Sequence, residues 1–200
     1  MSAPPVVVLD NGSGYLKAGL SNESQPRCTI PALIGRPMLR YGEEIEGVEL
    51  KEIMIGDEVI PVRSMLELTY PISEGIVQNP DDLALLWKYC LTQKLDVREN
   101  DFRNRKVLIT EAPSNPTKNK VKMGEILLEK MNVGGFNVEP QAMLTLYSEG
   151  LESGIVLDSG DGVSHCIPII SSFIMQHFIG RLNIAGRHIT NNFIKLLQLK

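Results

Sequence analysis

The sequence predicts an α/β fold. Short β-branched apolar runs, such as residues 5–9 and 107–110, have the composition of buried strands. Stretches with helical spacing of apolar side chains occur between such runs, as in residues 83–90. A strand-turn-strand pattern occurs near the N-terminus and again at residues 154–170. Strands and helices that follow one another along the chain in this way are typical of an α/β fold.

The composition narrows the class of protein before any motif is considered. The chain has 200 residues, and 20 Lys and Arg against 24 Asp and Glu give a formal net charge of −4. This balance disfavours nucleic-acid binding, which needs a basic face. No apolar run approaches the roughly 18–20 residues of a membrane span, and no basic region precedes an apolar one at the N-terminus. We therefore expect no membrane insertion and no secretory signal.

The three cysteines, Cys28, Cys90 and Cys166, are widely spaced and form no CxxC motif. Their odd number and spacing predict reduced thiols in an intracellular protein. They predict neither a disulfide framework nor a zinc site. The three histidines are also widely spaced, which disfavours a histidine metal site.

The first third of the chain is expected to begin with a hairpin and to continue irregularly. Apolar runs at residues 5–9 and 15–20 flank Asn11-Gly12, a pair that favours a type I′ turn. Prolines and turn residues break any period over residues 21–40. Residues 41–47 are acidic and glycine-rich and predict a mobile loop that becomes ordered against a neighbouring subunit. Short β-like pieces are expected at residues 48–50, 53–55 and 59–60.

Three helices are predicted in the middle of the chain. Asn79-Pro80-Asp81-Asp82 combines a capping residue, a proline at the first helical position and acids in the first turn. The side chains expected to form the buried stripe of this helix are Leu83, Leu86, Trp87 and Cys90. A second helix should open at Asn115-Pro116 and run toward residue 132, where Gly134-Gly135 ends it, and a third should span residues 140–147 up to Gly150.

The last fifty residues repeat the opening pattern. Strands at residues 154–157 and 163–170 flank a turn at residues 158–162, and a helix follows Gly186. The apolar stripe of that helix continues to Lys200 without a C-cap, which indicates a fragment or a truncated product.

The feature that carries chemistry is the repeated motif Asp10-x-Gly12-x-Gly14 and Asp158-x-Gly160-x-Gly162. Glycine turns can point several backbone N–H groups at one anion and so bind phosphate oxygens. Lys17 can reach the same phosphates as a point charge. The two aspartates would repel phosphate unless a hard cation such as Mg²⁺ lies between them.

The repetition is what makes this motif informative. One copy is a weak signal, because Asp and Gly are common in ordinary turns. Two copies on the same strand-turn-strand frame predict a two-sided phosphate clamp. The GxxxxGK[ST] motif and a GxGxxG after a strand are both absent, which disfavours a P-loop enzyme and a dinucleotide fold.

The two motifs in their full context resemble the actin family. Residues 10–19 (DNGSGYLKAG) and 156–165 (VLDSGDGVSH) resemble the two phosphate-binding hairpins of that family, and several linking stretches, including TEAP at 110–113 and LNIAGR at 182–187, are also similar. The resemblance covers residues 6–200 but only the first half of the family's length. It implies an α/β fold of the actin-like ATPase (ribonuclease H-like) type, with mixed sheets flanked by helices and an incomplete second lobe. It also implies an adenine pocket that lies beyond Lys200.

The resemblance also implies domains, cofactors and site residues. Residues 1–31 and 70–148 would form one subdomain, residues 32–69 a small insertion, and residues 149–200 the start of a second, poorly braced lobe. The implied cofactors are ATP and Mg²⁺. The implied phosphate-binding residues are Gly12, Ser13, Gly14, Tyr15 and Lys17 from the first hairpin and Ser159, Gly160, Asp161, Gly162 and Val163 from the second. Asp10 and Asp158 would hold the magnesium waters, while Gln141 and His165 would position the attacking water. The family pattern is broken at Pro80, Pro140, Asn183 and His188, and Pro140 adjoins Gln141.

A narrower resemblance concerns function. Residues 48–58, 63–67 and 115–120 resemble an actin-related subunit of the seven-subunit complex that nucleates branched actin filaments. This implies a filament-seeding protein of the cytoplasmic actin cytoskeleton, with at most slow ATP hydrolysis. The implied partners are the other subunits of the complex, actin and nucleation-promoting factors. Alternatives are conventional actin or another actin-related protein, a small-molecule kinase of the same ATPase superfamily, and a non-functional product.

Overall fold

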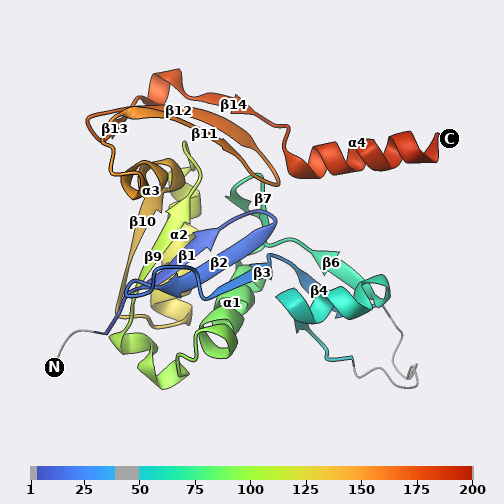
Figure 1. The fold of residues 1–200 in the computed structure, drawn as a ribbon. Helices are drawn as coiled ribbons and strands as arrows, with labels where there is room; N and C mark the ends of the chain where they lie inside the picture. The colour runs from blue at the N-terminus through green and yellow to red at the C-terminus, as the bar shows by residue number, and fades with distance from the viewer. Residues whose placement is uncertain (1–3, 39–49, 200) are drawn as a thin grey trace.

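A five-stranded mixed sheet forms the centre of the larger lobe in this computed structural model, which describes residues 4–38 and 50–199 (Figure 1). The sheet has the order β10-β9-β1-β2-β3. Its strands are β1 (Val7–Asn11), β2 (Tyr15–Leu20), β3 (Cys28–Pro31), β9 (Lys106–Glu111) and β10 (Gly135–Pro140). β1 pairs antiparallel with β2 and parallel with β9, and β10 pairs parallel with β9. The α/β class with mixed sheets is thus confirmed.

Helices cover this sheet and bury its apolar side chains. They are α1 (Pro80–Tyr89), continued by a π-helical turn η2 (Cys90–Lys94); the 3₁₀-helix η3 (Glu99–Asn104); α2 (Thr117–Glu125), continued by the π-helical turn η4 (Ile126–Lys130); and α3 (Gln141–Ser148). Val7 and Leu9 of β1 pack in the same core as Leu83 and Trp87 of α1, and all four are fully buried. The helix bounds agree with the sequence prediction, except that Asn132, with a φ of 54°, takes the left-handed conformation expected of a glycine.

The start of α1 confirms the predicted capping signal. Asn79 Oδ1 accepts hydrogen bonds from the backbone N–H groups of Asp81 and Asp82, at 3.1 and 3.2 Å. The predicted stripe is buried, with Leu83, Trp87 and Cys90 completely inaccessible. Local sequence alone is sufficient here because the cap and the stripe lie within one helix.

A small sheet is inserted between β3 and α1. It has the order β5-β4-β6, with β4 (Ile34–Pro37), β5 (Met54–Ile55) and β6 (Leu66–Thr69), and the 3₁₀-helix η1 (Gly56–Met65) connects β5 to β6. A two-stranded hairpin, β7 (Ile72–Ser73) and β8 (Ile76–Val77), follows it.

Two sequence interpretations of this region are wrong. Residues 21–40, where no period was found, contain β3 and β4, whose pairing partners lie elsewhere in the chain. Residues 59–60, expected to be β-like, lie in η1, because the fully buried Val59 packs in the small core with Leu33 and Met54. The predicted loop at residues 41–47 and most of the piece at 48–50 lie outside the described residues.

An ion pair between the half-exposed Arg36 and the buried Asp82 joins the inserted sheet to α1. Arg36 of β4 donates two hydrogen bonds to the carboxylate of Asp82, one of them at 3.2 Å, and Thr69 of β6 donates a third at 2.7 Å. Burial alone would raise the pKa of Asp82, but the hydrogen bonds from Arg36 and Thr69 outweigh it and hold this pKa below its ordinary value.

Replacing Asp82 with alanine should therefore lower the free energy of unfolding by roughly 2–3 kcal/mol at pH 7, less than for a fully buried pair because Arg36 can reach water. Because the folded-state pKa lies below the unfolded value, the stabilisation is present at neutral pH and is lost as the pH falls below about 4. Urea denaturation at pH 7 and in acid checks both statements. Asp81→Ala, in the same helical turn but with an exposed side chain, is the matched control, and an equal loss in both variants would contradict the assignment.

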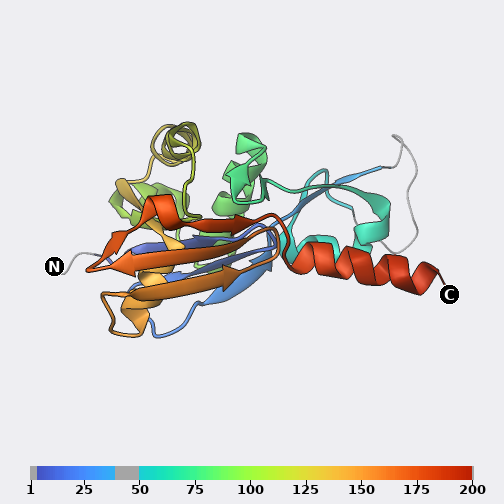
Figure 2. The same ribbon diagram turned by 90° about the horizontal axis from the view of Figure 1, so that it is seen from above.

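A second, smaller lobe lies above the five-stranded sheet, as the view from above shows (Figure 2). Its sheet has the order β11-β12-β13, with β14 also paired to β12. The elements are β11 (Gly154–Ser159), β12 (Ser164–Ile170), β13 (Phe173–Ile174), the 3₁₀-helix η5 (Gln176–Phe178), β14 (Gly180–Leu182) and α4 (Gly186–Gln198). One face of this second sheet packs on α3 in a separate small core that includes Leu146, Ile167 and Ile169.

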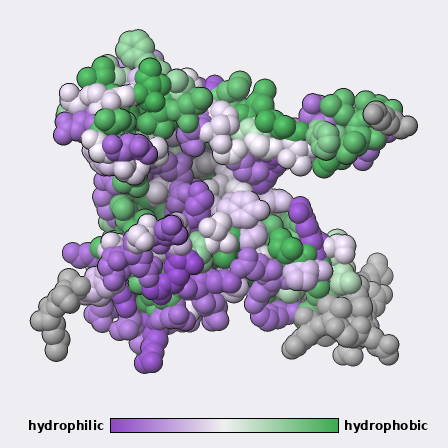
Figure 3. All heavy atoms as spheres, in the orientation of Figure 1, coloured by the Kyte–Doolittle hydropathy of each residue, from purple (hydrophilic) through white to green (hydrophobic). Residues whose placement is uncertain are grey.

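The upper face of this sheet and the helix α4 carry exposed apolar side chains. Ile155, Leu157 and Phe173 are 73%, 77% and 76% exposed, and Phe193 of α4 is 60% exposed. Figure 3 shows this apolar surface along the top of the second lobe and over α4. Over the described residues, no helix is both long and apolar enough to span a membrane.

Candidate functional site

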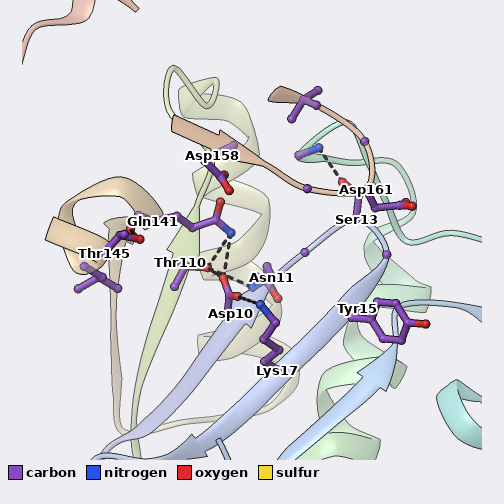
Figure 4. A pocket seen from close by; sticks show the side chains of 18 of the residues that line it. Asp10, Asn11, Ser13, Tyr15, Lys17, Thr110, Gln141, Thr145, Asp158 and Asp161 are labelled. Carbon is purple, nitrogen blue, oxygen red and sulfur yellow. Dashed lines mark hydrogen bonds and ion pairs between the residues drawn. The ribbon is translucent and has the colours of Figure 1, made fainter. Parts of the chain in front are cut away.

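A cavity of about 720 Å³ lies between the two lobes and is lined by both glycine turns. The β1-β2 hairpin forms one wall and the β11-β12 hairpin faces it, while α3 and the end of β9 close one side (Figure 4). All of the predicted site residues except Ser159 line it, namely Asp10, Gly12, Ser13, Gly14, Tyr15, Lys17, Gln141, Asp158, Gly160, Asp161, Gly162, Val163 and His165. Ser159 instead shares a 2.7 Å hydrogen bond with the hydroxyl of Ser164.

The turn between β1 and β2 is longer than the sequence predicts. Asn11 pairs with Leu16, so four residues, Gly12 to Tyr15, make the connection, and neither Asn11 nor Gly12 has a positive φ. The predicted type I′ turn is therefore wrong. Two hydrogen bonds hold Asn11 in the strand. Its buried side-chain oxygen Oδ1 accepts from Trp87 Nε1 at 2.9 Å, and its backbone N–H donates to Thr110 Oγ1 at 3.1 Å.

Asp10, at the end of β1, is the centre of a polar network. Its Oδ1 accepts hydrogen bonds from Thr110 Oγ1 at 2.6 Å and from Gln141 Nε2 at 2.9 Å. Its Oδ2 forms a 3.4 Å ion pair with Lys17 Nζ. In Figure 4 the carboxylates of Asp10 and Asp158 point toward the Gln141 amide from opposite sides. Side chains from four separate strands and one helix therefore converge on one point of the cavity.

The two glycine turns are in direct contact. A Cβ added to Gly14 would lie 2.8 Å from Asp161 Cβ, and one added to Gly162 would lie 3.2 Å from Ser13 Oγ and 3.3 Å from Glu74 Cα. Ser13 Oγ also accepts a 3.1 Å hydrogen bond from the Gly75 N–H. Side chains at these two glycines would push the lobes apart. The expectation of a poorly braced second hairpin does not agree with this arrangement.

Arg187, the second residue of α4, braces the two turns. Its guanidinium forms a 2.6 Å ion pair with Asp161, donates to the Ser13 carbonyl at 3.4 Å, and lies 4.2 Å from the centre of the Tyr70 ring. The backbone N–H of Arg187 also donates to the Asp161 carbonyl at 3.0 Å. The planar guanidinium suits such simultaneous ion pairing and stacking.

His165 of β12 lies at the cavity wall and is only 2% exposed. Among residues 4–38 and 50–199, neither of its ring nitrogens has a hydrogen-bond partner. Burial, followed by the positive charge of Arg181, lowers its pKa, and the opposing effect of Asp158 is smaller. The ring is therefore neutral at pH 7 and has one donor and one acceptor available. An unpaired buried polar group costs about 1–3 kcal/mol, which favours a bound water or ligand at this position.

Several cavity residues escaped the sequence analysis. Thr110, Thr145, Ser148 and Gly75 also line the cavity. Thr110 could have been suspected, because it is the polar residue that ends a predicted apolar strand, where side chains often reach a site. No local pattern marks Arg187 as a site residue, because its role depends on contacts with Ser13, Asp161 and Tyr70, which are distant in sequence.

Comparison with known proteins agrees with this geometry. The family model described as Actin matches residues 1–200. The chain is similar to actin-related protein 2 of Schizosaccharomyces pombe (44% identical over 199 residues, 100% of this chain and 50% of that protein) and of Acanthamoeba castellanii (44% over 195 residues, 98% and 50%). It is also similar to actin-related protein 2 of Arabidopsis thaliana (42% over 193 residues, 96% and 49%). The chain spans about half the length of these relatives. With two facing glycine turns on paired hairpins and a family match over its whole length, the chain belongs to the actin family.

Proposed function

We propose that this chain is the ATP-binding component of a complex that nucleates branched actin filaments, with the nucleotide acting as clasp and switch between the two lobes. The observation that carries the proposal is the contact between the two glycine turns across one cavity. A polyphosphate in that cavity would touch both lobes at once, and its binding would therefore favour their closed arrangement.

The cavity suits a polyphosphate. The backbone at Gly12 and Gly14 lies where an added Cβ would collide, 2.5 Å from the Tyr15 carbonyl oxygen and 2.8 Å from Asp161 Cβ, and Lys17 adds a positive charge at the rim. The second turn contributes Gly160 and Gly162 from the opposite wall. Such turns act as anion-binding concavities because several N–H dipoles point one way.

The residues present also suit Mg²⁺ held partly by the phosphates. Among the described residues no group of three or more His, Cys, Asp or Glu side chains could hold a metal ion alone. Asp10 and Asp158 line the cavity from opposite lobes. Mg²⁺ usually takes one or two carboxylates together with substrate phosphates and water. When bound, it would neutralise the repulsion between these carboxylates and the phosphates.

Gln141 and His165 are the candidates for positioning a water in slow hydrolysis. Gln141 is the first residue of α3 and is tethered to Asp10 and Thr110, so its amide is held at the cavity wall. His165 is neutral and has free hydrogen-bonding capacity. A neutral imidazole can accept a hydrogen bond from a water without carrying a charge of its own. Hydrolysis would thus be a slow timing step of the switch and not a metabolic activity.

Nucleotide affinity tests the binding proposal. We expect the chain to bind Mg²⁺-ATP at least tenfold more tightly than AMP in titration calorimetry, because the contacts serve the terminal phosphates and each charge-assisted hydrogen bond contributes about 1.5–3 kcal/mol. Ser13→Ala, in the cavity, should weaken ATP binding. Ser159→Ala, at the equivalent turn but outside the cavity, should not. Equal affinities for ATP and AMP, or equal effects of the two variants, would refute the proposal.

The assembly proposal rests on the relatives named actin-related protein 2. The proposed partners are the other subunits of the nucleating complex, actin and nucleation-promoting factors, in the cytoplasmic actin cytoskeleton. Co-expression with those subunits should give a complex that contains the tagged chain. Recovery of the complex without this chain would refute membership while leaving nucleotide binding intact.

A further inference from the structure

Two of the three cysteines lie side by side, although 62 positions separate them in the sequence. Cys28 is the first residue of β3, at the edge of the five-stranded sheet, and Cys90 begins η2 at the end of α1. Their sulfur atoms are 3.8 Å apart. Cys90 is fully buried, whereas Cys28 is partly open to solvent. A small solute can therefore reach the Cys28 thiol, whereas the Cys90 thiol is accessible only to Cys28.

Neighbouring contacts hold the two segments together. Arg27, the residue before Cys28, donates from Nη1 to the carbonyl of Leu95 at 3.4 Å, just past the end of η2. Lys94, the last residue of η2, forms a 2.8 Å ion pair with Asp57 of the inserted segment. The approach of the two sulfurs is thus fixed by contacts on both sides. The remaining movement to a disulfide bond length of about 2.05 Å is small, and an edge strand can shift with few hydrogen bonds disturbed.

The surroundings activate Cys28 and not Cys90. The hydrogen bond from the Cys90 thiol lowers the pKa of Cys28 to about 7, helped by Lys94 and the Ala18 backbone and opposed by burial and by Asp57. Arg27 is the other charged group close to this sulfur. The hydrogen bond with Cys28 and its own burial raise the pKa of Cys90. At neutral pH, Cys28 therefore supplies the thiolate and Cys90 the proton-bearing partner.

We propose that Cys28 and Cys90 are a peroxide-sensitive dithiol that closes to an intramolecular disulfide. The Cys28 thiolate attacks one oxygen of hydrogen peroxide, breaks the O–O bond and becomes a sulfenic acid, and the hydroxide released takes up a proton to form water. The Cys90 sulfur then attacks the sulfenyl sulfur, and the departing hydroxyl leaves with the Cys90 proton as a second water. Both thiols are oxidised and one peroxide is reduced.

The crosslink would change how the inserted sheet is tied to the larger lobe. The chain between Cys28 and Cys90 contains the whole of that sheet, the β7-β8 hairpin and Tyr70, which contacts Arg187 at the cavity. A disulfide would close this segment at its base. Neither cysteine lines the cavity, so the pair lies outside the proposed nucleotide site.

The test uses the full chain carrying Cys166→Ser, which removes the exposed third thiol. After treatment with hydrogen peroxide and alkylation of the remaining thiols, non-reducing peptide mapping should recover one crosslinked pair of peptides containing Cys28 and Cys90, and dithiothreitol should reverse it. In the Cys90→Ala variant, dimedone should capture a sulfenic acid at Cys28. Alkylation of both cysteines after peroxide treatment would overturn the proposal.

The pH dependence of the rate of disulfide formation tests the proposal without any substitution of Cys28 or Cys90. The rate of disulfide formation should rise with pH, reach half its maximum near pH 7 and level off above about pH 8, because the reactive form is the Cys28 thiolate. An ordinary cysteine, with a pKa near 8.5, would react increasingly faster up to higher pH. A midpoint at or above that ordinary value would overturn the assignment of Cys28 as the activated thiol.

Discussion

Replacing Asp158 with asparagine should weaken Mg²⁺-dependent ATP binding by about 10- to 100-fold, because the loss of one charge-assisted contact costs about 1.5–3 kcal/mol. The substitution preserves the shape of the side chain but removes a negative charge from the cavity wall. Since carboxylate and phosphate attract each other only through the cation, the variant should also lose most of the difference between binding with and without Mg²⁺. Titration calorimetry with ATP, with and without Mg²⁺, measures both effects.

Glu152→Gln provides the control for Asp158→Asn. Glu152 is an exposed acid on the same lobe that does not line the cavity, so its replacement makes the same change in net charge. It should leave ATP affinity unchanged within about twofold, since exposed charges are screened by salt. Unchanged Mg²⁺-dependent binding in Asp158→Asn would show that this carboxylate does not serve the cation.

Replacing Trp87 with alanine should lower the free energy of unfolding by about 3–5 kcal/mol, the cost of removing a large side chain from a packed core. Trp87 is fully buried in α1, and its ring N–H donates to Asn11 Oδ1 at the base of the first glycine turn. The variant should therefore lose core packing and also loosen the turn. Urea denaturation followed by circular dichroism is the measurement, because the chain has a single Trp and the variant loses that fluorophore.

Two further variants separate packing from hydrogen bonding at Trp87. Trp87→Phe keeps an aromatic ring but leaves Asn11 Oδ1 without its donor, and a loss of about 1–3 kcal/mol is expected. Phe178→Ala removes an aromatic side chain that is 71% exposed and should change stability by less than about 0.5 kcal/mol. A loss in Trp87→Ala no larger than that in Phe178→Ala would contradict the core assignment.

The sequence predicted those parts of the fold whose signals are local. The cap at Asn79 and the stripe ending at Cys90 lie within one helix, and the strand at residues 107–110 is a continuous apolar run. The strands β3 and β4 were missed because they are short, end in proline and depend on partners outside their own segment. Strand formation of this kind is decided by tertiary contacts more than by composition.

The candidate site was likewise predictable only where its sequence signals are local. The repeated glycine motif identified two turns, and the structure brings them to one cavity. Asn11 has the composition of a turn residue, but Trp87 and Thr110 hold it in a strand. The proximity of Cys28 to Cys90 is equally invisible in the sequence, since an odd number of scattered cysteines gives no pairing rule.

The contacts of Arg187 have a consequence for how the cavity opens. One side chain touches the first turn through Ser13, the second turn through Asp161, and the end of the inserted segment through Tyr70. Separating the lobes breaks these three contacts together. A half-open cavity would therefore lose most of the contact energy but would not yet gain the conformational freedom of the fully open cavity. The mouth of the cavity should consequently have two states, open and closed, with little population between them. A ligand that spans the mouth would shift all three segments to the closed state together.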